Sequence, residues 1–61
     1  MLFRRGDIVV SNRKDLLGIP MTVVHLSNEL RVCECEYDMD GEMYCEILSF
    51  DILTVLVEAE D

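Results

Sequence analysis

The chain has 61 residues, 51% of them hydrophobic, and a formal net charge of −8 at pH 7. A chain of this length forms one small domain that buries roughly 60% of the surface exposed by its unfolded form. Its apolar runs are too short to span a membrane. Residues 1–31 carry a net charge of +2, whereas residues 32–61 hold ten acids, no base and a net charge of −10. An acidic surface repels phosphate backbones, so the second half is a poor candidate for binding nucleic acid.

The first third of the chain predicts two strands separated by a loop. Residues 7–11 form a β-branched run after a Gly-Asp turn, which indicates a strand. Asn, Asp, Gly and Pro punctuate residues 12–20, which predicts a loop, and residues 21–26 follow its proline as a second strand. Three apolar side chains of the loop are expected to cover one end of the core: Leu16, Leu17 and Ile19. Alternation along the second strand places Met21, Val23 and His25 together on one face.

The best specified stretch is 30–49, which predicts two strands folded about a tight turn. Asp38 suits the first position of a type I turn, and Gly41 suits the left-handed position after it. Together they predict a three-residue loop closed by a glycine bulge, and this loop sets the register. The expected register pairs Cys35 with Cys45 and Cys33 with Ile47 on one face. On the other face it pairs Glu36 with Tyr44 and Glu34 with Glu46. One face of the hairpin is then apolar and the other acidic.

The last third of the chain predicts a closing strand and a short tail. Uneven apolar spacing at residues 50–53 indicates a single helical turn, residues 54–57 read as a strand, and residues 58–61 as an acidic, solvated tail. Five short strands with close turns predict an all-β domain over residues 1–57. Because closure hides the edges of a sheet, we expect the five strands to form a small barrel with a central hairpin.

The acidic hairpin face is the first candidate site. Its expected members are Glu34, Glu36, Tyr44 and Glu46. Like charges opposite one another in a sheet are mildly destabilising, so an arrangement that retains them suits the binding of a basic protein partner. A second copy of the chain is an alternative partner, and a face that is only solvated is the alternative without function.

The basic residues of the first half form a second candidate site, for nucleic acid. Its members are Arg4, Arg5, Arg13 and Lys14, which would gather on one edge if the first loop folded near the amino terminus. Proteins that bind single strands usually combine a basic groove with several stacking aromatic residues. This chain has two Tyr, two Phe and no Trp. Nucleic-acid binding is therefore the weaker alternative to protein binding.

Three cysteines and one histidine are the only set that could bind a soft metal. Two cysteines one residue apart on a strand lie about 6.5 Å apart, whereas zinc ligands lie about 2.3 Å from the metal. We therefore expect Cys33, Cys35 and Cys45 to point into the core as small hydrophobic residues. Zinc binding and a Cys35–Cys45 disulfide stay open as alternatives.

Catalytic motifs are not found in the sequence. It has no glycine-rich phosphate loop, no nucleophile elbow and no pair of acids with a positioned partner, so we expect neither catalysis nor a cofactor. The amino terminus also lacks the apolar core of a signal peptide. A cytoplasmic location follows as an expectation, and there the thiols would stay reduced.

Four short motifs resemble the YodC-like family of uncharacterised small bacterial proteins. They lie at residues 3–10, 20–23, 35–37 and 50–53 and together span most of the chain. In that family a Gly-Asp-x-Val opening leads through a Gly-Pro-x-Met-Thr-Val loop to a Cys-x-Trp-Phe strand, and Tyr37 stands here at the Trp position. The resemblance implies an SH3-like barrel and no established activity. The same opening also begins the KOW motifs of ribosome and transcription factors, which motivates the nucleic-acid alternative.

Overall fold

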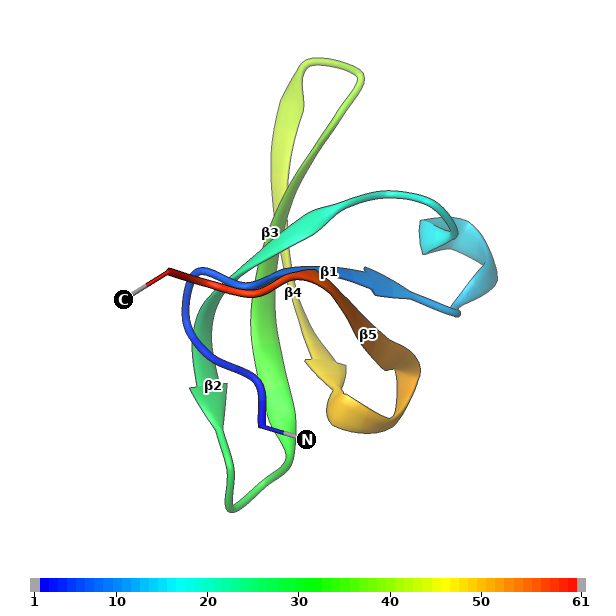
Figure 1. Cartoon of the computed structure of the whole chain (residues 1–61). Helices are drawn as coiled ribbons and strands as arrows, with labels where there is room; N and C mark the ends of the chain where they lie inside the picture. The colour runs from blue at the N-terminus through cyan, green and yellow to red at the C-terminus, as the bar shows by residue number, and fades with distance from the viewer. Residues whose placement is uncertain (1, 61) are drawn as a thin grey trace.

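The computed structural model describes residues 2–60, which form one antiparallel sheet (Figure 1). Its elements are β1 (Ile8–Ser11), η1 (Lys14–Leu16), β2 (Met21–Ser27), β3 (Val32–Met39), β4 (Glu42–Ser49), η2 (Phe50–Ile52) and β5 (Leu53–Val57). The two η elements are single 3-10 turns. The five predicted strands and the helical turn before the last strand are thus confirmed. No helix in the described part of the chain is long and apolar enough to cross a membrane.

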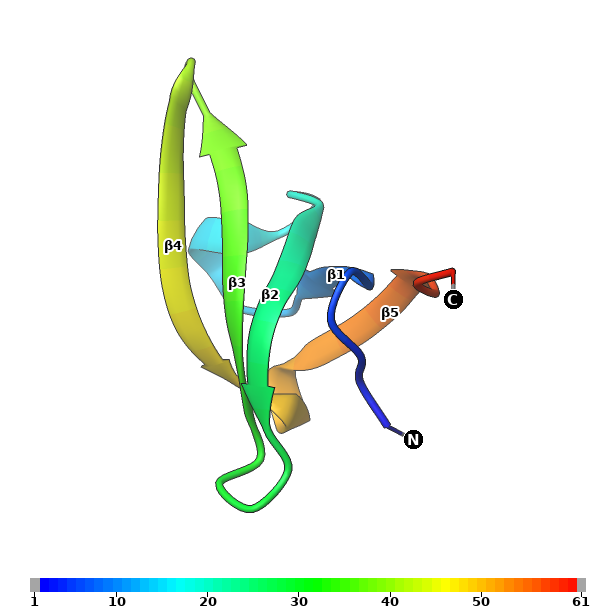
Figure 2. The same cartoon turned by 90° about the vertical axis from the view of Figure 1, so that its left-hand side faces the viewer.

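The strands follow the order β4-β3-β2-β1-β5, so β4 and β5 are the two edges of the sheet. The ladder is therefore open within residues 2–60. The short strand β1 joins its two parts, because it pairs with β2 on one side and with β5 on the other. Figure 2 shows β4, β3 and β2 side by side, with β1 and β5 lying across one side of them.

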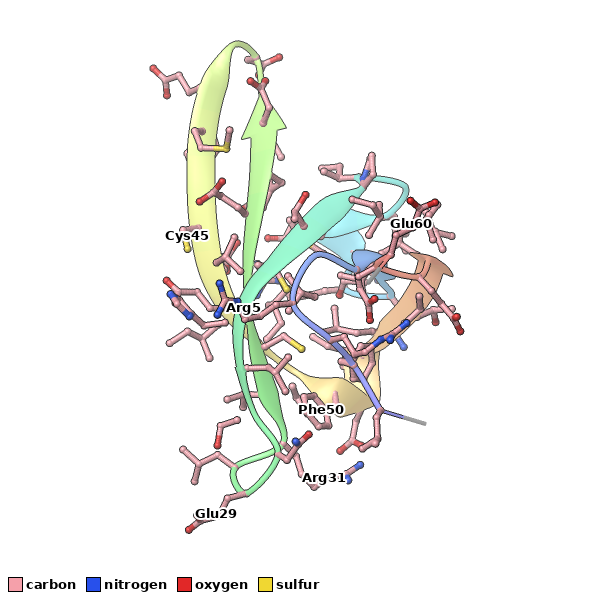
Figure 3. All side chains as sticks on the ribbon, turned by 60° about the vertical axis from the view of Figure 1, so that its left-hand side comes forward. Arg5, Glu29, Arg31, Cys45, Phe50 and Glu60 are labelled. Atoms are coloured by element: carbon pink, nitrogen blue, oxygen red, sulfur yellow. The ribbon has the colours of Figure 1, made fainter. Side chains whose placement is uncertain are left out.

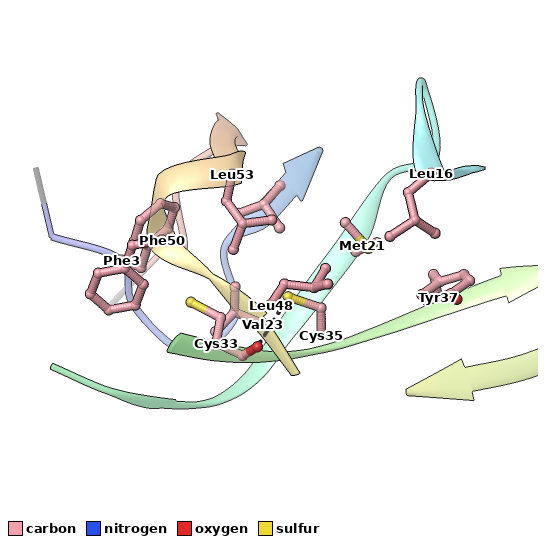
Figure 4. Packing of buried hydrophobic residues seen from close by; sticks show 11 residues of the cluster. Phe3, Leu16, Met21, Val23, Cys33, Cys35, Tyr37, Leu48, Phe50 and Leu53 are labelled. Atoms are coloured by element: carbon pink, nitrogen blue, oxygen red, sulfur yellow. Dashed lines mark hydrogen bonds between the residues drawn. The ribbon is translucent and has the colours of Figure 1, made fainter. Parts of the chain in front are cut away.

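The core lies on the side of β2, β3 and β4 that is covered by β1, β5 and the two 3-10 turns (Figures 2 and 4). Phe3 and Phe50 close one end with ring centroids 4.8 Å apart. Leu16 of η1 closes the other end, as predicted, whereas Leu17 is 60% exposed, contrary to prediction. The buried hydrophobic residues are Phe3, Val9, Leu16, Met21, Val23, Cys33, Cys35, Tyr37, Leu48, Phe50 and Leu53.

A bulge in β2 overrides the predicted alternation of that strand. Val23 lies opposite Cys35 and His25 opposite Glu34, so Val24 is an extra residue between the two pairs. An extra residue reverses the side to which the following side chains point. His25 is consequently exposed and does not share the buried face of Val23, so the predicted face of His25 was wrong.

A buried carboxylate ties together the two ends of the described chain. Asp7 accepts hydrogen bonds from the backbone amides of Arg4 at 2.8 Å and Ala59 at 2.7 Å, and it is only 1% exposed. The Arg4 guanidinium also donates to the Ala59 carbonyl at 3.0 Å. Gly6 suits this close approach, since its φ is +91° and a Cβ there would lie 3.2 Å from the Ala59 Cβ. The predicted solvated tail is therefore fixed at Ala59, and Asp61 lies outside the described residues.

Candidate functional site

The turn of the central hairpin is one residue shorter than predicted. Asp40 and Gly41 both have positive φ, of 55° and 82°, and Met39 pairs with Glu42 directly across them. This is a two-residue loop of the type I′ kind, whose twist matches that of the flanking strands and which favours Asp-Gly. The three-residue loop with a glycine bulge was wrong. Asp38 instead accepts a hydrogen bond of 3.3 Å from the amide of Gly41.

The shorter loop shifts every hairpin pair by one residue. The observed pairs are Glu34 with Ile47, Cys35 with Glu46, Glu36 with Cys45 and Tyr37 with Tyr44. Directly opposite residues point to the same side of a sheet. Glu34 and Glu36 therefore point away from the core, whereas Tyr44 and Glu46 share the other side with Cys35 and Tyr37. The structure splits the predicted four-residue site into two halves.

We use the term outer face for the side of β2, β3 and β4 that points away from β1 and β5. Its register positions belong to Thr22, His25, Ser27, Val32, Glu34, Glu36, Asp38, Met43, Cys45, Ile47 and Ser49. Two apolar side chains stand out on it, because Met43 is 63% exposed and Ile47 is 70% exposed. The outer face is thus mixed, with carboxylates on β3 and apolar side chains on the neighbouring β4.

Cys45 lies on the outer face, as Figure 3 shows, and the prediction that it points inward was wrong. Its Sγ donates to Oε2 of Glu34 at 3.1 Å. This hydrogen bond, together with partial desolvation and the nearby carboxylates, raises the pKa of the Cys45 thiol and holds it protonated. The same side chain cannot pair with Cys35, which lies on the opposite face of the hairpin.

The other two thiols are buried, as predicted. Cys33 and Cys35 lie in the centre of the core (Figure 4). Burial is the main cause that raises the pKa of Cys35 to about 12, and it also raises the pKa of Cys33. All three cysteines are free thiols. Among residues 2–60, no group of three or more His, Cys, Asp and Glu side chains is placed to hold a metal ion.

A shallow hollow opens on the outer face where β2, β3 and β4 meet. It has a volume of about 210 Å³ and is lined by His25, Leu26, Ser27, Val32, Glu34 and Ile47. Its surface is mostly apolar, and Glu34 is the one acidic residue in its lining. Lysine and arginine bury an aliphatic stem while keeping a charged head in a polar position. The lining of the hollow, apolar side chains with one acidic residue, suits a side chain of this kind.

Glu46 belongs to a chain of polar contacts at the rim of the core. The Tyr37 hydroxyl donates to Oε2 of Glu46 at 2.6 Å, and Arg13 donates to both carboxylate oxygens at 2.8 and 3.0 Å. These donors hold the pKa of Glu46 below its ordinary value, and the Tyr37 contact raises the pKa of that phenol to about 12. Glu46 therefore clamps the first loop onto the hairpin. Tyr44 stacks on Tyr37 with ring centroids 5.6 Å apart.

The structure does not bring the four predicted basic residues together. Arg4 and Arg5 precede β1, whereas Arg13 and Lys14 follow it, so the strand separates the two pairs (Figure 1). The Arg13 guanidinium is also bound by Asp15, at 2.7 Å, as well as by Glu46. Its charge is thus engaged by two carboxylates of the same chain.

Sequence reasoning missed the apolar half of the outer face. It placed Ile47 and Cys45 inside, because the assumed loop was one residue too long. The Asp40-Gly41 dipeptide was the available signal, since Asp-Gly between two alternating strands favours a type I′ hairpin.

Comparison with known proteins found no matching family model and no curated protein or solved structure of significant similarity. The resemblance to the YodC-like family therefore stays a prediction.

Proposed function

We propose that this chain is a non-catalytic protein-interaction module whose outer face binds a basic segment of another protein. The observation that carries this proposal is the pairing, on one surface, of the carboxylates of Glu34 and Glu36 with the exposed side chain of Ile47. Met43 and Ile47 are exposed apolar side chains on the same face, and such a group of side chains is typical of a surface that becomes covered in a complex. The adjacent carboxylates select a partner that carries positive charge.

The distribution of charge within the chain supports a basic partner from outside. Residues 32–61 contain no Lys or Arg. Of the basic residues in the first half, Arg13 is bound by Asp15 and Glu46, and Arg31 lies 3.5 Å from Asp51. Neither Glu34 nor Glu36 forms an ion pair within the described chain. A basic segment would therefore meet uncompensated negative charge on the outer face.

We also propose that the sheet curls as an SH3-like barrel of the YodC-like family. The position of β1 supports this proposal, because one short strand pairs with both β2 and β5. The 3-10 turn Phe50–Ile52 directly before the last strand is a second point in its favour. A solved crystal structure of the chain would test whether the sheet curls in this way.

The test of the outer face uses a synthetic peptide of alternating lysine and valine, matched in length to the eight residues of β4. Binding is followed by fluorescence anisotropy at low ionic strength. The double variant Glu34→Gln/Glu36→Gln should weaken binding about fivefold to tenfold, since two exposed charge contacts are lost.

The matched control is Glu58→Gln/Glu60→Gln, which removes the same charge from exposed positions after β5. It should leave most of the affinity intact. Equal losses for the two double variants would show that only net charge attracts the peptide, and the outer face would not be its site. A peptide of alternating glutamate and valine should not bind.

A further inference from the structure

β4 is an edge strand whose free side carries unpaired backbone groups. It is eight residues long and pairs with β3 alone among the described strands (Figure 2). Natural proteins usually shorten, cover or interrupt a long edge, because such an edge is a template for another strand. Here β4 contains no proline, and its register with β3 is unbroken from Glu42 to Ser49.

The register identifies which amides of β4 are free. A two-residue loop makes Met39 and Glu42 a hydrogen-bonded pair, and bonded and non-bonded pairs alternate along an antiparallel ladder. The backbone groups of Tyr44 and Glu46 therefore point toward β3. Those of Met43, Cys45 and Ile47 point toward the free edge. The same three residues place their side chains on the outer face.

We propose that the basic partner binds by adding an extended strand to the free edge of β4. This inference rests on the proposed function and specifies how the partner is held. Strand addition obtains affinity from main-chain hydrogen bonds and specificity from alternate side chains. One set of partner side chains would lie beside Met43, Cys45 and Ile47, near the carboxylates of Glu34 and Glu36. The other set would lie beside Glu42, Tyr44 and Glu46.

Charge identifies the occupant of this edge. Acidic side chains flank β4 on both faces, with Glu34 and Glu36 on the outer face and Glu42 on the other, where Glu46 is already bound by Arg13. A second copy of the chain would bring the same acids and another net charge of −8 to the edge. Like charges on adjacent strands are destabilising, whereas lysine or arginine on the added strand would pair with them. An extended basic segment of a different protein fits the edge better than a second copy.

Two modified peptides test the backbone contacts without changing the protein. Both have the alternating lysine and valine sequence, but one is N-methylated at every lysine and the other at every valine. An added strand forms hydrogen bonds to β4 through only one of its own two edges, and alternate residues of the peptide supply the N–H groups of that edge. One of the two peptides should therefore lose at least about tenfold in affinity, because its backbone hydrogen bonds are removed. The other should bind like the unmodified peptide.

Amide hydrogen exchange on the complex with the unmodified peptide tests the protein side. The amides of Met43, Cys45 and Ile47 should exchange more slowly when the peptide is bound. Those of Tyr44 and Glu46 serve as the internal control, because they already bond to β3 in the free protein. Protection of the first three amides, together with selective loss for one methylated peptide, would support strand addition.

Other results separate the two proposals. Strand addition would be overturned if both methylated peptides bound equally well and no amide of β4 gained protection. The interaction function would still stand if Glu34→Gln/Glu36→Gln weakened that binding. Absence of binding by the unmodified peptide at low ionic strength would overturn the basic partner itself. If the protein sedimented as a dimer, and the amides of Met43, Cys45 and Ile47 were protected before any peptide was added, the edge would belong to a second copy.

Discussion

The buried carboxylate of Asp7 permits a prediction whose size follows from the structure. In Asp7→Asn, one side-chain oxygen can still accept a hydrogen bond, but the new NH₂ group faces a backbone N–H. The variant thus loses one charge-assisted bond outright and weakens the other, at the two contacts now 2.7 and 2.8 Å long. Bonds to charged groups contribute roughly 1.5–3 kcal/mol each, and an unsatisfied buried donor costs about 1–3 kcal/mol. We expect a destabilisation of about 2–4 kcal/mol.

This loss is large for so short a chain. At about 0.05–0.15 kcal/mol per residue, the whole domain has a free energy of unfolding of roughly 3–9 kcal/mol. Urea unfolding followed by far-UV circular dichroism should show a clearly lower midpoint with an unchanged slope. Hydrogen exchange should show faster exchange at the amide of Ala59, which bonds to Asp7 in the native protein.

The matched control is Asp38→Asn, which makes the same chemical change at an exposed side chain. Asp38 accepts only one bond, of 3.3 Å, from Gly41. Both variants reduce the net charge of −8 by one, so relief of self-repulsion is the same in each. We expect Asp38→Asn to change stability by no more than about 0.5 kcal/mol. Equal midpoints for the two variants would refute the reasoning that Asp7 ties the chain ends together.

Three further predictions concern the hairpin. The pKa of Glu46 is held below its ordinary value of 4.5, so the stability that its contacts provide is fully present above that pH and is lost as the pH falls through the lowered pKa. The free energy of unfolding, measured in urea at a series of pH values, should therefore fall less at acidic pH in Glu46→Gln than in the native protein. A thiol-reactive dye should label only Cys45 in the folded protein, because the other two thiols are buried. Glu34→Gln should speed this labelling, since the Glu34 carboxylate raises the pKa of the Cys45 thiol, and an unchanged rate would contradict that contact. Gly41→Ala should lower the free energy of unfolding, measured in urea, by about 1–2 kcal/mol, because the φ of Gly41 is +82°. A Cβ there would meet no atom within 4 Å, so this loss comes from backbone conformation and not from a steric clash.

The contacts at the rim of the core explain why residue type alone misassigned part of the site. Glutamate is a residue type that usually lies on the surface, yet Tyr37 and Arg13 bind Glu46, and Arg13 lies 33 residues away in the chain. An acid used in this way contributes to the attachment of the first loop. Acids that form no ion pair within the described chain, such as Glu34 and Glu36, remain to attract a partner.

Local sequence determined where the strands lie and much of what they bury. Alternation of apolar and polar residues marked β3, and it correctly placed Cys33 and Cys35 in the core. Such patterns are readable because successive side chains on a strand point to opposite faces, whatever the strand pairs with. Uneven apolar spacing likewise marked the helical turn at Phe50–Ile52.

Tertiary structure decided the register, and with it the composition of the outer face. A loop one residue shorter than expected moved Cys45 and Ile47 outward and Glu46 inward, because the side-chain period of a strand is two residues. The contacts of Arg13 with Glu46 and of Asp7 with Ala59 join residues 33 and 52 positions apart. Local patterns carry no record of such pairings, since only the folded sheet brings these residues within hydrogen-bonding distance.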